Sequence, residues 1–135
     1  MVPHRAKIVS MIAALNFGAV IGGVAAGALS ASLLALLFSS ILTLVGLENG
    51  DGIGLVVGIV LGLAAGGWVA GSRANHSERF HGMVTGLLLA FVVVVVARLG
   101  GSDASTLVIV WQAFLAIVIS GFAGWWAGRR KTPTG

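Results

Sequence analysis

The sequence predicts an all-α integral membrane protein, a four-helix up-and-down bundle packed through small residues. Of its 135 residues 58% are hydrophobic and 9% are charged, and the mean hydropathy is +1.07, which is outside the range of soluble globular domains. About 20 residues cross a bilayer, so this length holds about four spans with short connections. A glycine recurs at every fourth position, Gly54, Gly58, Gly62 and Gly66, in a stretch without charge. We expect a single membrane domain over residues 1–135.

The first apolar stretch, residues 8–47, is long for one span. As a single helix it would measure about 60 Å, twice the hydrocarbon thickness. We expect one long tilted helix spanning residues 15–47, with its first turns near or below the inner interface. Two spans with a turn near Gly22 and Gly23 or near Gly27 are the alternative, which breaks the charge pattern described below.

A signal peptide is a further alternative for this stretch, since Ala26-Gly27-Ala28 resembles a cleavage site and Arg5 and Lys7 precede it. The apolar run before this site is too long for a signal peptide, and it continues to Leu47 without a polar break. Cleavage would truncate the first span. We therefore expect no cleavage, which an intact-mass measurement would check.

Three further spans are predicted, each of a length that fits one helix: 53–71, 82–99 and 107–127. They are separated by polar, turn-rich segments: 48–52, 72–81 and 100–103. Ser102 or Asp103 is placed to cap the last helix. Short connections between helices make consecutive helices antiparallel neighbours.

The basic residues predict the orientation of the spans. With connections assigned to alternate sides, one side holds Arg5, Lys7, Arg73, Arg79, Arg129, Arg130 and Lys131, and the other holds only Arg98. By the positive-inside rule the first side is cytoplasmic, so we expect both termini inside. The basic residues expected to contact lipid headgroups are Arg73, Arg79, Arg129, Arg130 and Lys131. Trp68, Trp125 and Trp126 fall toward the inner headgroup level.

Small residues recur at four-residue spacing on every predicted helix. Besides the first track, the series are Ala19, Gly23, Gly27, Ala31 and Ala35; Gly82, Gly86 and Ala90; and Ala116, Ser120, Gly124 and Gly128. In membranes such glycine zippers let helix backbones approach closely and favour right-handed crossings. Two interpretations are open: packing inside one bundle, or contact of one track, most plausibly that of residues 53–71, with another protomer or protein.

The sequence lacks the residues that catalysis and proton-coupled transport require. Cysteine is absent, and no ionisable residue lies well inside a predicted span, Arg98 being the nearest. His76, Glu78 and His81 do not have the spacing of a zinc site, so we expect a solvated loop and no metal. No nucleophile with a base, carboxylate pair or phosphate loop can be assembled, so we expect no enzymatic activity and no cofactor. Topology explains the basic residues better than nucleic acid binding does.

Two side-chain amides in the apolar segments need partners beyond their own helix turn. These belong to Asn16 and Gln112, which have more donors and acceptors than the preceding carbonyls can serve. We expect Gln112 to reach another helix or the outer interface.

The segment Gly66-Gly67-Trp68-Val69-Ala70-Gly71-Ser72-Arg73, followed by His81-Gly82-Met83-Val84-Thr85-Gly86, resembles a pattern of the YrzE-like family of small bacterial four-span membrane proteins. The resemblance covers the second span, the next loop and the third span. It implies four spans in a bacterial inner membrane and carries no activity. Small multidrug transporters and fluoride channels fit less well, because their carboxylate and pore motifs are missing.

Two functions are consistent with these observations. The first is a non-enzymatic integral membrane protein acting through helix packing, either as an accessory subunit bound to other membrane-protein subunits or as a homo-oligomer. The alternative is a small channel or transporter for a neutral or weakly polar solute, with hydroxyls and glycine carbonyls along its path. The two differ in whether the polar side chains hold helices together or face water.

Overall fold

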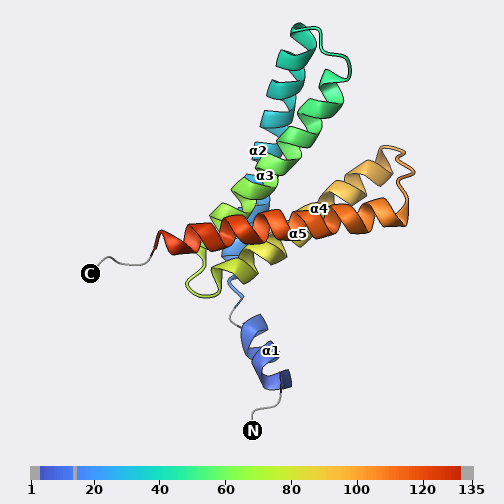
Figure 1. Ribbon diagram of the computed structural model, residues 1–135. Coiled ribbons are helices and arrows are strands. Elements are labelled where there is room, and N and C mark those ends of the chain that lie inside the picture. The colour runs from blue at the N-terminus through green and yellow to red at the C-terminus, as the bar shows by residue number, and fades with distance from the viewer. Residues whose placement is uncertain (1–3, 14, 132–135) are drawn as a thin grey trace.

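The computed structural model describes residues 4–13 and 15–131 (Figure 1). These residues form five helices and no strand: α1 (His4–Ala13), α2 (Phe17–Leu44), α3 (Gly50–Arg73), α4 (Glu78–Leu99) and α5 (Thr106–Arg129). Helices α2 to α5 are each long and apolar enough to cross a bilayer, with mean hydropathies of 2.1 to 2.4. The predicted all-α fold with four spans is confirmed, and the chain is a multi-pass membrane protein.

The first apolar stretch is divided at Asn16. The Asn16 side chain accepts a hydrogen bond from the Ala19 backbone N–H at 3.2 Å, so it caps the N-terminus of α2. Helix α2 then continues without a turn through Gly22, Gly23 and Gly27, and the two-span alternative is therefore wrong. The expected continuous helix is also interrupted, because Asn16 has extended backbone angles, φ −82° and ψ 97°, which do not fit inside a helix. At about 42 Å, α2 exceeds the hydrocarbon thickness of about 30 Å and fits a tilted span.

The two connections at the hairpin tips are tight turns held by side chains. Between α2 and α3, Gly46 and Asn49 adopt left-handed φ angles of 79° and 62°. There Asp51 receives hydrogen bonds from the Thr43 hydroxyl at its Oδ1, 2.9 Å, and from the Ser39 hydroxyl at its carbonyl, 3.1 Å. These bonds fasten the tip of one helix pair.

Between α4 and α5 the cap differs from the prediction. Ser105, rather than Ser102 or Asp103, accepts from the Val108 N–H at 3.5 Å and caps α5. Arg98 reaches across the same loop and donates to the carbonyls of Ser102 and Ala104, at 3.3 and 2.8 Å. The Arg98 guanidinium thus closes the turn.

The four long helices form two antiparallel hairpins, α2–α3 and α4–α5, which cross near one end and diverge toward their tips (Figure 1). Helix α3 is central, since it contacts α2, α4 and α5, whereas α2 and α5 do not contact each other. Helix α1 extends away from the crossing (Figure 1). The hairpins therefore meet at an angle instead of lying parallel along their whole length.

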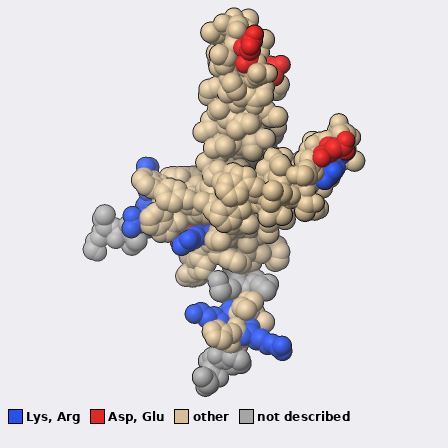
Figure 2. All heavy atoms as spheres, turned by 45° about the vertical axis from the view of Figure 1, so that its right-hand side comes forward, with Lys and Arg blue, Asp and Glu red and all other residues tan. Residues whose placement is uncertain are grey.

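Charges are separated between the two ends of the molecule. Acidic side chains gather at the two hairpin tips, and most basic side chains lie around the crossing and on α1 (Figure 2). The acids at the tips are Glu48, Asp51 and Asp103. Between these ends the surface is apolar, as a bilayer environment requires.

Candidate packing site at the helix crossing

The glycine track of α3 lies against α2. Its residues face small residues of that helix: Gly54 faces Ser39, Gly58 faces Ala35, Gly62 faces Ala31 and Gly66 faces Gly23. A Cβ atom at Gly58 would lie 2.5 Å from the Ala35 nitrogen, and one at Gly66 would lie 2.8 Å from the Gly23 carbonyl oxygen. Any side chain at these positions would force the helices apart. Helix α2 of the same chain therefore occupies the face that could have served another protomer.

The reciprocal glycines of α2 complete this contact and extend it to α4. A Cβ at Gly23 would lie 2.7 Å from the Gly66 carbonyl oxygen, so the two backbones touch at this level. A Cβ at Gly27 would lie 2.6 Å from Cδ1 of Leu89 on α4. Gly27 therefore sits where three helices meet.

A second pair of glycines on α3, Gly67 and Gly71, packs against α5. A Cβ at Gly71 would lie 2.5 Å from the Gly124 carbonyl oxygen, and Gly67 faces Ser120. This pair was not among the predicted packing residues, although its four-residue spacing lies one position along from the main track. One position turns about 100° around a helix, so the pair faces a different neighbour.

Helices α4 and α5 approach through the same kind of contact. A Cβ at Gly82 would lie 2.5 Å from the Ser120 carbonyl oxygen, and one at Gly86 would lie 2.5 Å from the Ala116 carbonyl oxygen. A Cβ at Gly124 would lie 2.8 Å from the Glu78 carbonyl oxygen. Gly128 differs, because its neighbour is the flexible Glu78 side chain and not a backbone. At the crossing, therefore, the helices touch backbone to backbone.

Two hydroxyls are enclosed at this crossing. Thr85 and Ser120 are fully buried, and neither Oγ1 of Thr85 nor Oγ of Ser120 has a hydrogen-bond partner among the described residues. Their small size suits the close approach, since Cγ2 of Thr85 would lie 3.0 Å from a Cβ at Gly23. These side chains fill space between helices.

His81 is buried and not part of a solvated loop, which corrects the sequence interpretation. Helix α4 begins at Glu78, four residues before the predicted span, and this places the ring in the helix with 1% of its surface exposed. Its Nε2 accepts the Asn16 backbone N–H at 2.9 Å, so the proton lies on Nδ1, which donates to the Ser77 carbonyl at 3.0 Å. The ring thus ties the start of α2 to α4.

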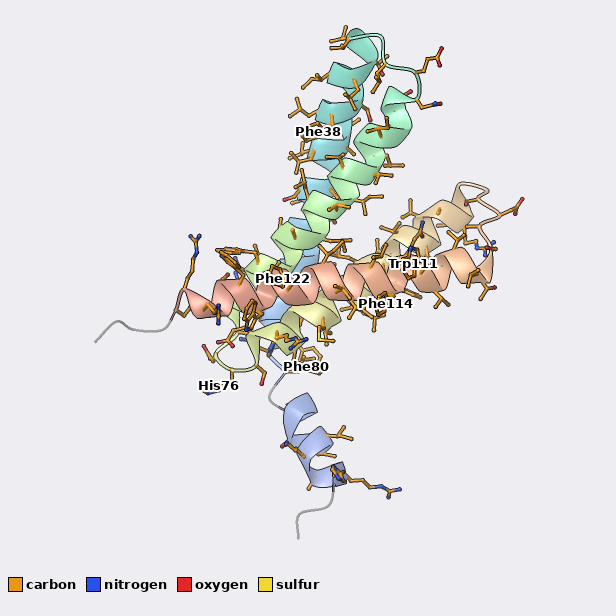
Figure 3. All side chains as sticks on the ribbon, in the orientation of Figure 1. Phe38, His76, Phe80, Trp111, Phe114 and Phe122 are labelled. Atoms are coloured by element: carbon orange, nitrogen blue, oxygen red, sulfur yellow. The ribbon has the colours of Figure 1, made fainter. Side chains whose placement is uncertain are left out.

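His76 and Glu78, the two residues grouped with His81 in the sequence analysis, lie apart from this ring. His76 is exposed in the loop before α4, with Phe80 on the first turn of that helix (Figure 3). Glu78 lies against Gly128. In residues 4–13 and 15–131, no three side chains of the metal-ligating types converge.

The basic residues near the crossing have individual contacts. The Lys131 ammonium donates to the carbonyls of Gly71 and Ala74, at 3.2 and 2.8 Å, and so satisfies the C-terminus of α3. The guanidinium of Arg130 lies 5.3 Å from the Trp68 ring centre, and that of Arg129 lies 4.2 Å from the Trp125 ring centre. Two further cations are exposed: Arg73, beside Gly22, and Arg79. Lys131 thus holds the fold together, in addition to any contact with lipid.

Beyond the crossing, the diverging hairpins enclose two apolar clefts, which together we call the wedge. The first cleft has a volume of about 380 Å³ and is lined by α2, α3 and α4; the second has about 180 Å³ and is lined by α3, α4 and α5. Ile59, Leu63 and Val93 line both clefts. Gln112 is exposed at the edge of the second cleft, without reaching another helix through a hydrogen bond in the described residues.

No protein family, curated protein or solved structure matches this chain. The resemblance to the YrzE-like family stays a prediction from two sequence segments. The function is therefore argued from the geometry of the crossing and the wedge.

Proposed function

We propose that the protein is a non-enzymatic membrane protein that acts through helix packing, as an accessory subunit or as a homo-oligomer. Its partner helices bind in the wedge. The observation that supports this most directly is the divergence of the hairpins, which leaves α2 and α5 without contact and exposes apolar faces of α3 and α4. In a bilayer, such faces are covered by lipid chains or by another transmembrane helix.

The glycine contacts support the wedge rather than a glycine track as the partner surface. The track from Gly54 to Gly66 is covered by α2, and Gly67 and Gly71 are covered by α5. A partner therefore has to bind where half-buried side chains of ordinary size line the clefts. Ile59 and Val93 are such side chains.

The alternative, a small channel or transporter, has weaker support. Its path would need polar groups that face water. Ser39 and Thr43 instead bond to Asp51 and fasten one hairpin tip. Thr85 and Ser120 are enclosed where the helix backbones touch. The polar side chains thus act in helix packing.

The separation of charge supports an orientation with the crossing on the cytoplasmic side and both termini inside. A membrane-impermeant maleimide tests this orientation, because the chain has no cysteine of its own. We expect labelling from outside of Leu47→Cys, at a hairpin tip, and no labelling of Asn75→Cys, in the loop before α4. The reverse pattern would refute the orientation.

Photocrosslinking from single cysteines tests the proposed partner surface. Ile59→Cys carries a benzophenone in the wedge, and Leu33→Cys carries it at a similar depth on an exposed face outside the wedge. In membranes of the native host, we expect a discrete adduct from position 59 and none from position 33. Native mass spectrometry of gently extracted protein then identifies the adduct partner as another subunit or a second copy.

Two results would contradict the proposal. Equal crosslinking from positions 59 and 33 would show collisions in the membrane without a defined surface. Recovery as a monomer, together with solute flux in liposomes, would favour the channel instead.

A further inference from the structure

We propose that a groove between α4 and α5, at the basic end of the molecule, binds one anionic phospholipid. An acyl chain lies along the groove, and the phosphate lies at Arg79. We call this the inner groove. It is separate from the wedge, and the proposal does not depend on any partner helix.

The inner groove has a volume of about 290 Å³ and is mainly apolar. Its lining residues are Met83 of α4 and Ile117, Val118, Gly121, Phe122 and Trp125 of α5, with Arg79 as the only charged member. Phe122 lies in the inner half of α5 (Figure 3). At Gly121 a Cβ would lie 2.6 Å from Cγ of Met83, so the missing side chain lets Met83 lie close to α5.

The length of the groove matches part of an acyl chain. From Trp125 to Val118 the helix rises about 10 Å, and one leaflet contributes about 15 Å of hydrocarbon. A groove of this length accommodates part of one acyl chain, and the charged residue at its end indicates a lipid with an anionic headgroup as the occupant.

The charge at the end of the groove selects the headgroup. Arg79, on the first turn of α4, is exposed and makes no hydrogen bond or ion pair with the described residues. The Arg129 guanidinium lies over the Trp125 ring that borders the same end. Guanidinium groups bind phosphate oxygens through paired hydrogen bonds, and tryptophan is favoured at the headgroup level. The nearest acid, Glu78, has its side chain against Gly128.

Native mass spectrometry of the full-length protein in detergent tests the proposal. Phosphatidylglycerol and phosphatidylcholine with identical acyl chains are titrated separately. We expect one tightly retained phosphatidylglycerol and much weaker retention of phosphatidylcholine. Arg79→Gln should weaken phosphatidylglycerol binding about fivefold, which corresponds to about 1 kcal/mol for one cation.

Two further variants separate the groove from general attraction to charge. Arg73→Gln removes the same charge from an exposed residue of the other hairpin, and we expect its binding to stay within about twofold of the wild type. Val118→Trp fills the groove at an exposed position, where folding is not at risk, and should reduce binding of both lipids.

Three results would overturn the proposal. These are equal binding of the two lipids, an equal loss from Arg73→Gln and Arg79→Gln, and unchanged binding in Val118→Trp. Displacement of the lipid by millimolar inorganic phosphate would also overturn it, because the site would then recognise free phosphate and not a lipid.

Discussion

The two hairpins use small residues over different lengths. In α2–α3, small residues face each other from Gly66 near the crossing to Gly54 near the tip, where the Asp51 hydrogen bonds add to the contact. In α4–α5, backbone contact is found near the crossing, at Gly82, Gly86 and Gly124, and larger side chains follow toward the tip. Helix α3 accordingly packs more extensively on α2 than α4 packs on α5.

This difference shows what fixes the angle between the hairpins. Small residues draw the hairpins together near the crossing, where Gly67 and Gly71 of α3 face Ser120 and Gly124 of α5. At the same end, Gly23 and Gly27 of α2 lie against Thr85 and Leu89 of α4. Close contacts of this kind favour crossings of about 40°. Transmembrane helices tilt by up to about 40°, so two hairpins can share such an angle within one bilayer. Because the two hairpins are in close contact only at the crossing, they diverge beyond it, and this divergence forms the wedge.

The largest effect is expected from Gly58→Leu in the middle of the α2–α3 contact. The new side chain meets the Ala35 backbone, which cannot move aside, so we expect a loss of about 3 kcal/mol in the free energy of unfolding. Thermal unfolding in detergent, followed by circular dichroism, measures it. Gly52→Leu is the matched control, because a Cβ at Gly52 has nothing within 4 Å. Equal melting temperatures for Gly58→Leu and Gly52→Leu would show that Gly58 is not in close contact with α2.

A buried histidine that joins the hairpins is expected to give the next effect. His81→Phe leaves the Asn16 N–H without its partner, at a cost of about 2 kcal/mol, whereas the Ser77 carbonyl still accepts the backbone N–H of residue 81. Hydrogen exchange should become faster at the first amides of α2. His76→Phe, at an exposed loop position, should change neither the free energy of unfolding nor the exchange rate of these amides. Unaltered exchange in His81→Phe would show that the ring does not hold α2.

Enlarging one alanine toward each hairpin tip compares the contact inside a hairpin with the space between the hairpins. Ala35→Leu enters the contact with Gly58 and should cost about 1–3 kcal/mol. Ala97→Leu extends into the first cleft and should cost less than about 1 kcal/mol. Equal losses in chemical unfolding would mean that the hairpins are packed as tightly against each other at Ala97 as α2 is against α3.

The smallest effects come from one substitution made at two positions. Thr85→Val replaces a buried hydroxyl that has no partner, so we expect stability to be unchanged or to rise by about 1 kcal/mol. Thr43→Val removes the bond to Asp51 and should lower stability by about 1 kcal/mol. In matched melting curves, a lower melting temperature for Thr43→Val and an unchanged or higher one for Thr85→Val would support these roles of the two hydroxyls. A clear loss in Thr85→Val would require an undetected partner for that hydroxyl.

The spans were predictable from sequence because hydropathy and length depend only on local composition. The break at Asn16 was not predicted, since an amide within an apolar run gives no sign that it will cap a helix. The cap at Ser105 was missed because Ser102 and Asp103 fit the same rule. His81 was placed in the loop because the predicted span began only at the next residue.

The crossing could be predicted only in part. Four-residue spacing indicates that some backbone approaches Gly58 or Gly86, and close neighbours are found at both. The spacing does not identify the neighbouring helix, which depends on how each track winds around its own axis. Gly67 and Gly71 show this, because one step along α3 changes the partner from α2 to α5.

The divergence of the hairpins is the central claim, and a distance between their tips tests it most directly. Spin labels at Leu47→Cys and Ser102→Cys, in a chain without other cysteines, report this distance by pulsed electron paramagnetic resonance in lipid nanodiscs. Arms of about 27 Å that cross at about 40° place the tips roughly 20 Å apart. A narrow distribution at about 20 Å or more is the expected result. A distribution near 10 Å, the spacing of parallel packed helices, would contradict the account.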